Sequence, residues 1–180
     1  MIQQCQRYLA LDGRLAGVLA GDDKAANAGE QIGFGTLCQR KKLYLAAARF
    51  HRDAFGADVK LAENVPSNAR YNAACCAALA ACAQGNDGDK PDDAERGQWR
   101  QQALEWLQAD LAWWAKALAN DGKRSAGPVR QIMKSWQQDP DLAGVREKVA
   151  LAGLPDAERN KWTTFWDGVE ALVNRAQDKK

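Results

Sequence analysis

His51 is the only histidine of the chain and is therefore the first residue to consider for acid–base chemistry. A histidine base in a hydrolase needs a hydroxyl nucleophile and a carboxylate that orients its ring. The serines are Ser67, Ser125 and Ser135, and none of them lies in a GxSxG context. His51 follows Phe50 in an alanine-rich, apolar stretch, so we expect it to pack in a core. A small hydrolase that uses His51 stays open as an alternative function.

The cysteines form a second group with chemical potential; they are Cys5, Cys38, Cys75, Cys76 and Cys82. Cys75 and Cys82 would lie on one face of a helix, and with Cys76 they would make a soft-metal or redox patch. An odd number of cysteines without CxxC spacing argues against a disulfide framework and a structural zinc site. We expect free thiols that pack as small apolar groups in a reducing cytoplasm, with no metal and no other cofactor.

An acidic segment, residues 87–93, reads Asp-Gly-Asp-Lys-Pro-Asp-Asp and superficially suggests calcium. It lacks the EF-hand spacing that ends in a bidentate glutamate. We therefore expect a solvated loop here.

Two of the seven tryptophans are candidates for contact with a ligand. Helical spacing places Trp106, Trp162 and Trp166 in core stripes. Trp113 and Trp114 are adjacent and must point in different directions, so we expect one of them to be exposed or to line a groove. Tryptophan is enriched at binding hot spots, which makes this pair a candidate contact for a partner.

The elements that position these residues are predicted to be helices. Proline is scarce, and no run alternates apolar with polar residues in the manner of a strand. Ser67 or Asn68 would cap one helix, another would begin after Gly127-Pro128, and residues 84–93 would form a polar loop. The helices are expected near residues 2–19, 30–39, 44–55, 71–82, 94–119, 129–136 and 155–173, with a short helical turn within 142–154.

Part of this pattern resembles a tetratricopeptide repeat. The repeat has a Leu-Gly pair in its first helix and small, aromatic and small residues in its second. Phe34-Gly35 takes the place of that pair here, followed by Ala47, His51 and Ala54, with Val59 where the repeat usually has proline. Small residues at these positions let the two helices of a hairpin approach closely.

The whole chain resembles the C-terminal region of large planctomycete-type bacterial proteins that carry serine/threonine kinase or WD40-repeat domains. The more specific stretches are 102–113, 136–146 and 154–172. The resemblance implies an accessory tetratricopeptide-like region excised from, or truncated out of, a larger signalling protein. The kinase signatures themselves, a Gly-rich phosphate loop, an HRD-like loop and DFG, do not occur in this sequence.

The resemblance also suggests which polar residues meet a partner. Arg70 and Asn72 open the inner helix of the second repeat unit, and Gln31 and Arg40 flank the inner helix of the first. Inner helices line the concave surface of tetratricopeptide domains, so a polar groove at these residues would accept hydrogen-bonding or acidic peptide groups. Solvated surface or helix capping is the alternative interpretation. Asp110 stands where the repeat prefers alanine.

Composition and charge exclude several classes. With 46% hydrophobic and 27% charged residues among 180, the chain can build a core. A net charge of +2 is not the basic surplus of a nucleic-acid-binding protein. Residues 2–7 are too polar for a signal peptide, and no apolar run approaches the ~20 residues of a membrane helix.

The sequence therefore predicts one all-α domain over residues 1–180, built of stacked antiparallel helical hairpins in a tetratricopeptide-like superhelix of about seven or eight helices. The best repeat register covers 28–61, a second unit with an insert covers 68–120, and a helical cap covers 126–177. We expect a cytoplasmic, non-catalytic scaffold that binds a protein or peptide, not nucleic acid or membrane. A self-association module, working as a homodimer, is the main alternative.

Overall fold

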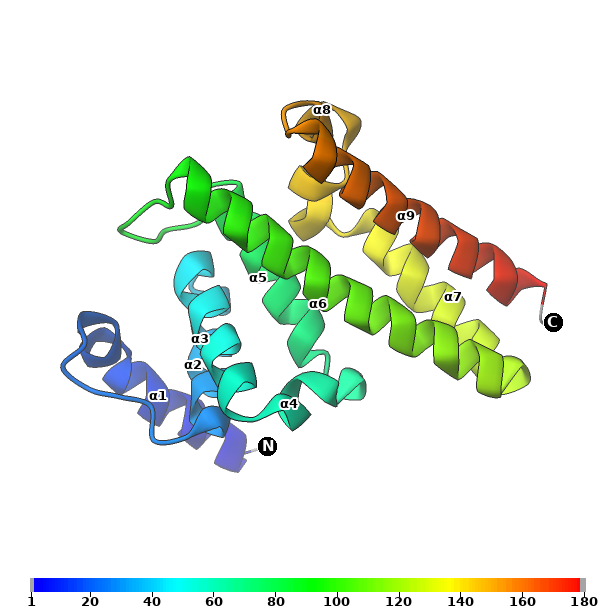
Figure 1. The fold of residues 1–180 in the computed structure, drawn as a ribbon. Helices are drawn as coiled ribbons and strands as arrows, with labels where there is room; N and C mark the ends of the chain where they lie inside the picture. Colours follow the sequence, from blue (N-terminus) through cyan, green and yellow to red (C-terminus); the bar gives the residue numbers. More distant parts are fainter. Residues whose placement is uncertain (1, 179–180) are drawn as a thin grey trace.

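The computed structural model describes residues 2–178, without the side chains of residues 2–5 and 7. Every regular element in this range is helical (Figure 1). The long helices are α1 (Ile2–Ala20), α2 (Ala28–Arg40), α3 (Tyr44–Ala57), α5 (Ala69–Ala81), α6 (Asp93–Asn120), α7 (Gly122–Gln138) and α9 (Asp156–Gln177). The short elements are the helices α4 (Val59–Glu63) and α8 (Lys148–Ala152) and the 3-10 turns η1 (Val65–Ser67) and η2 (Pro140–Val145). The predicted all-α fold is confirmed.

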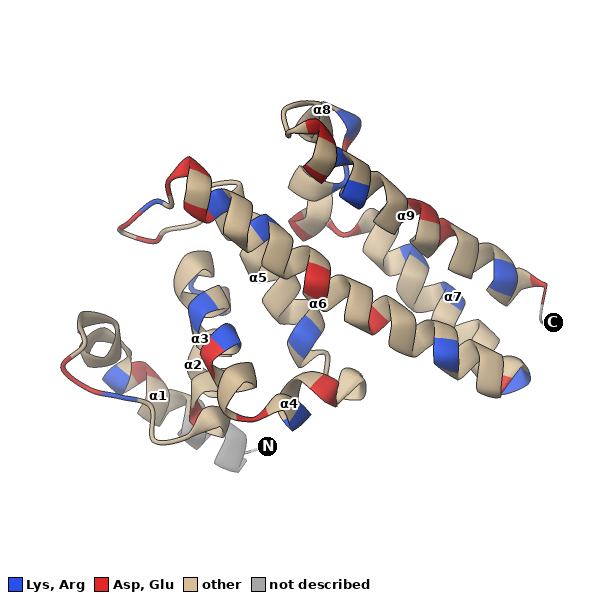
Figure 2. Cartoon of the chain, viewed as in Figure 1, with Lys and Arg blue, Asp and Glu red and all other residues tan. Residues whose placement is uncertain are grey.

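Helix α6 runs across the molecule and separates two groups of helices (Figure 1). On one side α7 and α9 pack against each other, and both contact α6. On the other side α2 and α3 form a hairpin, α3 packs on α5, and α5 packs on α6. Lys, Arg, Asp and Glu are interspersed along the helices (Figure 2). Among residues 2–178, no helix is both long and apolar enough to cross a bilayer.

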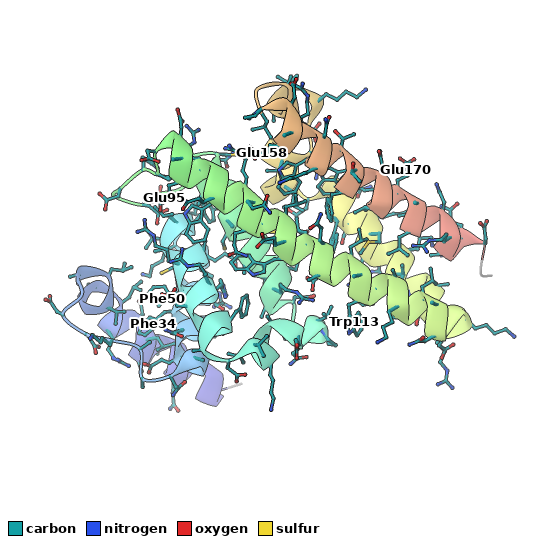
Figure 3. The ribbon with its side chains drawn as sticks, in the orientation of Figure 1. Phe34, Phe50, Glu95, Trp113, Glu158 and Glu170 are labelled. Atoms are coloured by element: carbon teal, nitrogen blue, oxygen red, sulfur yellow. The ribbon has the colours of Figure 1, made fainter. Side chains whose placement is uncertain are left out.

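Helix α5 lies at the centre because its side chains are small. Residues 73–81 are alanine, cysteine and a single leucine, and all of them are buried. Small side chains allow neighbouring helix axes to come close, and α3, α6 and η2 all pack against α5. Larger side chains fill the space between the outer helices. Phe34 of α2, for example, stacks on Phe50 of α3 with ring centroids 5.5 Å apart (Figure 3).

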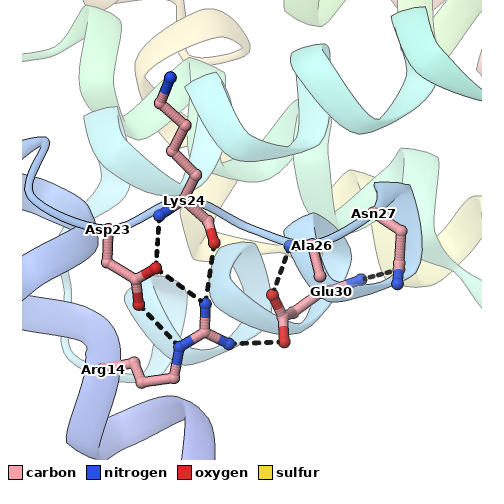
Figure 4. A network of polar contacts seen from close by, with 6 residues as sticks. All are labelled: Arg14, Asp23, Lys24, Ala26, Asn27 and Glu30. Carbon is pink, nitrogen blue, oxygen red and sulfur yellow. Dashed lines mark hydrogen bonds and ion pairs between the residues drawn. The ribbon is translucent and has the colours of Figure 1, made fainter.

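The loop between α1 and α2 is held by a network around Arg14 (Figure 4). The Arg14 guanidinium donates to the carboxylates of Asp23 and Glu30, each at 2.7 Å, and to the Lys24 carbonyl at 2.8 Å. The side chain of Asn27 caps α2 by accepting from the Glu30 N–H. The hydrogen bond to Asp23, followed by the one to Glu30, raises the pKa of Arg14 above its ordinary value. The Arg14 guanidinium, which is charged at all ordinary pH values, ties the loop to both helices through these hydrogen bonds.

The segment between α5 and α6 is docked on the α2–α3 turn. The Asn86 N–H donates to the Lys42 carbonyl at 2.7 Å. The Asp87 carboxylate accepts from the N–H groups of Leu45 and Ala46 at 3.1 and 3.0 Å, and so caps α3. The prediction of a solvated loop is wrong for Asp87, because the free N–H groups at the start of α3 attract a carboxylate.

Helix α7 begins earlier than the sequence predicts. We expected a start after Pro128, but α7 begins at Gly122 and contains that proline. The Asp121 carboxylate accepts from the Arg124 N–H at 3.2 Å and caps the helix at its true start. Proline removes one backbone hydrogen bond inside a helix. Burial of Val129 and its neighbours against the core holds the helix in place despite this loss.

The connection between α3 and α5 contains two elements that were not predicted, α4 and η1. Of the two candidate caps for α5, the Ser67 Oγ accepts from the Ala69 N–H at 3.2 Å. Asn68 adopts a left-handed conformation, with φ 58°, and its side chain caps nothing. The prediction is therefore right for Ser67 and wrong for Asn68, because the sharp turn from η1 into α5 needs a residue that tolerates positive φ.

Replacing Gly85 by alanine should destabilise the protein. Gly85 has φ +101°, and a Cβ there would lie 2.5 Å from the Lys42 carbonyl oxygen. We expect Gly85→Ala to lower the free energy of unfolding by about 1–3 kcal/mol in urea denaturation. Gly88→Ala in the same segment is the matched control, since its Cβ meets nothing within 4 Å. Equal stability of the two variants would contradict the docking of this segment on the α2–α3 turn.

Candidate functional site

A pocket of about 200 Å³ lies at the amino-terminal end of α5, where α2, α3, α4 and η1 meet it. We call it the His51 pocket. Its lining residues are Ile32, Thr36, His51, Leu61, Asn64, Ser67, Ala69 and Asn72. Asn64 and Ser67 are exposed and form its mouth, whereas His51 is only 1% exposed and forms its floor.

The His51 ring is buried without a hydrogen-bond partner. Neither Nδ1 nor Nε2 has one among the described residues. The ring lies against Phe55, with centroids 5.9 Å apart. Burial lowers the pKa of His51 to about 4, so the ring is neutral near neutral pH and carries one donor and one acceptor. A buried polar group without a partner costs free energy, which makes these two atoms the feature of the pocket most in need of a ligand.

The other polar side chains of the pocket are two hydroxyls, Thr36 and Ser67, and two amides, Asn64 and Asn72. The hydroxyl of Thr36 donates to the Ile32 carbonyl at 2.9 Å, and that of Ser67 donates to the Asn64 carbonyl at 2.6 Å. The Thr36 oxygen therefore keeps its lone pairs for a ligand, whereas the Ser67 oxygen, which also accepts from the Ala69 N–H, keeps one. The Asn72 side-chain amide forms no hydrogen bond with the described residues, so its donors and its acceptor are available.

The two predicted partner-binding residues of α2 lie apart. Gln31 is half-buried one residue before Ile32 of the pocket wall, and its Oε1 is buried without a partner in the described chain. Arg40 lies at the other end of α2, about 13 Å along the helix axis at ~1.5 Å per residue. Its guanidinium lies over the Tyr8 ring, 4.7 Å from the centroid. The structure therefore brings Gln31 near the pocket and leaves Arg40 away from it.

Arg70 and Asn72 open the same helix but face different neighbours. Arg70 Nε donates to the Asp110 carboxylate of α6 at 2.7 Å, in a pair whose side chains are 12% and 3% exposed. Burial raises the pKa of Asp110, and the Arg70 charge opposes part of that rise. The Asp110 carboxylate thus neutralises the Arg70 guanidinium. Only Asn72 reaches the pocket.

Trp113 (labelled in Figure 3) and Trp114 lie on α6, and neither belongs to the pocket lining. Their rings meet edge to face with centroids 4.7 Å apart. Trp113 is 38% exposed and Trp114 packs partly against the core, so the expectation that one of the pair is exposed is confirmed. Of the tryptophans expected in the core, Trp106 and Trp162 are buried and Trp166 is half-buried.

The pocket does not assemble a catalytic triad among the described residues. Ser67 lines the same pocket as His51, but its hydroxyl donates to a backbone carbonyl. The pocket lining contains no carboxylate, so nothing in it would orient the imidazole as a base. The side chains that line the pocket are suited to hydrogen bonding with a ligand.

The cysteines whose side chains are described are free thiols. Cys38, Cys75 and Cys76 are buried, Cys82 is partly buried, and Cys5 lies outside the described side chains. Burial raises the pKa of the Cys38 thiol to about 12 and raises those of the others too. Within the described residues, no group of three or more His, Cys, Asp or Glu side chains could hold a metal.

A larger hollow of about 450 Å³ lies between α7, η2, α8 and α9. Its charged side chains carry both signs, and its most enclosed one, Arg146, is already engaged. Arg146 Nη1 donates to the carbonyls of Trp136 and Asp139 at 3.1 and 2.7 Å. The Trp166 indole N–H donates to the Val145 carbonyl at 2.8 Å. This hollow therefore lacks the unpartnered buried group that distinguishes the His51 pocket.

The sequence singled out Asn72 as a partner-binding residue, and Asn72 lines the pocket. The predicted packing of His51 in the core is confirmed, whereas the sequence carries no signal for Thr36 and Asn64 as lining residues. Asn64 and Ser67 enter the pocket through α4 and η1, which the sequence did not predict. The available signal was a single histidine in an apolar stretch next to Phe50, which also describes an ordinary core residue.

Comparisons with known proteins do not place the chain in a family: no protein-family model, no curated protein and no solved structure matches it. The resemblance described from the sequence therefore remains a prediction, and the site has to be interpreted from its own geometry.

Acidification should destabilise the protein through His51. The unfolded chain takes up the proton near pH 6.5, whereas burial holds the pKa of the folded His51 at about 4, so stability should fall between these values. The loss should be about 1.4 kcal/mol per pH unit. In denaturant unfolding at pH 7 and pH 4.5, the wild type should lose about 2 kcal/mol more than His51→Leu. Parallel losses in the two proteins would show that His51 is not buried and neutral.

Removing Arg70 should be far more harmful than removing the whole ion pair. Arg70→Met leaves the Asp110 carboxylate buried without a partner and should cost about 3–5 kcal/mol of unfolding free energy. The double variant Arg70→Met/Asp110→Leu has no uncompensated charge and should recover most of this stability. Chemical denaturation of both single variants and the double variant measures the coupling. If the double variant lost as much unfolding free energy as the two single variants together, the direct pairing of Arg70 with Asp110 would be contradicted.

Proposed function

We propose that the chain is a non-catalytic scaffold that binds a peptide segment of another protein at the His51 pocket. The observation that carries the proposal is the buried His51 ring, whose nitrogens have no partner among the described residues. A peptide that lies across the exposed Asn64 and Ser67 would insert one side chain toward this ring. A pocket of about 200 Å³ suits a side chain better than a drug-sized ligand, whose sites usually exceed ~300 Å³.

Tetratricopeptide-like stacking is part of this proposal. In stacked hairpins, each unit contacts only its neighbours, through the second helix of one hairpin and the first helix of the next. Here α3 contacts both α2 and α5, and α5 contacts α6. These contacts are those expected of two successive hairpins, α2–α3 and α5–α6. In that arrangement α2 and α5 are the inner helices, and Gln31 and Asn72 lie on them.

We also propose that the chain is an accessory region of a larger, cytoplasmic signalling protein of the planctomycete type. The sequence resemblance over stretches such as 136–146 carries this proposal, and that stretch is itself held by hydrogen bonds between its residues and to α5. Arg146 binds the carbonyls of Trp136 and Asp139, while the Asp139 carboxylate accepts from the Tyr71 hydroxyl at 2.6 Å. The buried free thiols, whose raised pKa values keep them protonated, suit a reducing compartment.

Self-association is the second candidate, and the exposed Trp113 is the observation that favours it. A homodimer that buries Trp113 against its copy would use the chain as a structural module. No arrangement in the described residues favours the hydrolase alternative, since His51 lacks both a carboxylate and a hydroxyl partner.

Selection of linear peptides from a random phage-displayed library tests the proposal. Peptides that bind the immobilised chain should be enriched, and Asn72→Ala should weaken their binding at least about tenfold, because it removes hydrogen bonds inside the pocket. Asn174→Ala, at an exposed position of α9, is the matched control and should bind normally. Unfolding curves of both variants exclude a change in stability.

Two outcomes would contradict the proposal. Enriched peptides whose binding ignores Asn72→Ala would place the interaction elsewhere. Failure to enrich any peptide, together with a tight homodimer in sedimentation that Trp113→Ala dissociates, would favour self-association.

A further inference from the structure

The His51 pocket has an uncharged lining. None of its eight lining residues is Asp, Glu, Lys or Arg. The nearest basic residue along α5, Arg70, is already paired with Asp110. A carboxylate in the pocket would lose its hydration without meeting a cation, and an ammonium group would lose it without meeting an anion. Burial of an unpaired charge is strongly unfavourable, so the pocket selects a neutral group.

The hydrogen-bonding groups of the pocket are of both kinds. The Asn72 amide offers donors and an acceptor, and neutral His51 carries one donor and one acceptor on ring nitrogens that are themselves almost fully buried. The Thr36 oxygen adds acceptor capacity, and the Ser67 oxygen adds one lone pair beside the one that accepts from the Ala69 N–H, because both hydroxyl protons already bind backbone carbonyls. A ligand with only acceptors, such as an ester, would leave acceptors of the pocket unmatched. A ligand group that matches these donors and acceptors must itself both donate and accept hydrogen bonds.

The apolar wall shows what must carry this group. Ile32 and Leu61 face the same space as the polar side chains. They would contact methylene groups, while the polar end of the ligand reaches the His51 floor. A pocket of about 200 Å³ has the volume of roughly six to seven water molecules at ~30 Å³ each, which accommodates one side chain of medium length.

We infer that the His51 pocket binds the side-chain carboxamide of a glutamine or asparagine in the partner's peptide. This inference rests on the proposed peptide-binding function. The carboxamide is neutral, it carries an NH₂ donor and a carbonyl acceptor, and it stands on an apolar stem. Its carbonyl accepts from the protonated nitrogen of His51 or from Asn72, and its NH₂ donates to the hydroxyl oxygens of Thr36 and Ser67.

The single histidine makes the test direct, because its ring signals in an NMR spectrum are unambiguous. The chain, labelled with ¹³C and ¹⁵N in histidine, would be titrated at neutral pH with three capped amino acids up to their solubility limits. The probes are N-acetyl-glutamine methylamide, the corresponding glutamate, and the corresponding norvaline as an apolar control. Asn72→Ala and Thr36→Val remove hydrogen-bonding groups, and Asn174→Ala is the remote control.

The glutamine probe should shift the His51 ring signals in a saturable manner. The glutamate probe should bind at least about tenfold more weakly, the norvaline probe more weakly still, and Asn72→Ala should reduce the glutamine response. Backbone amide spectra confirm that each variant is folded. Glutamate binding as tight as glutamine, equal binding of norvaline, or no shift with any probe would overturn the inference.

The two proposals fail separately. If library peptides bind the chain and Asn72→Ala weakens them, but no probe moves the His51 signals, the carboxamide inference is wrong and peptide binding at the His51 pocket stands. If the glutamine probe binds while no peptide is enriched, the pocket takes a small free amide and the scaffold function is wrong.

Discussion

The close packing around α5 is the constraint on which the rest of the structure depends. A helix made almost entirely of alanine and cysteine has little side-chain volume, so α3, α6 and η2 can all lie against it at once. A larger residue within the buried stretch 73–81 would have to displace one of these neighbours. The hairpin α2–α3 and the bundle of α6, α7 and α9 are therefore joined through a single small-residue helix.

The pocket exists because this small-residue run begins only at residue 73. In the turn before it, three successive larger side chains leave α5 in three directions. Arg70 pairs with Asp110 of α6, and Tyr71 donates to Asp139 and stacks on Trp136 with centroids 5.1 Å apart. Asn72 faces the third direction, toward α2, α3 and α4. The side chains of Arg70 and Tyr71 anchor α5 to its neighbours, whereas the Asn72 side chain remains free to bind a ligand.

The predictability of fold and site differs for physical reasons. The long helices followed from apolar periodicity and from scarce proline, since both are local properties of the chain. The early start of α7 could not be predicted from such local properties, because the Asp121 cap and the burial of Val129 outweigh the cost of Pro128 inside the helix. The role of Arg70 depends on Asp110, forty residues away in the sequence. The pocket needs Asn64 and Ser67 brought over His51 by the α4–η1 segment, which carries no periodic signal.

The most direct test of the account is to locate a bound peptide relative to the unique His51 ring. Intermolecular nuclear Overhauser effects would be recorded between the His51 ring protons and a library-selected peptide, with Trp166 indole protons as the reference for the α7–α9 hollow. The account predicts effects from His51 to the methylene and amide protons of one peptide side chain. Effects confined to Trp166 and its neighbours, with none to the His51 ring protons, would contradict the account.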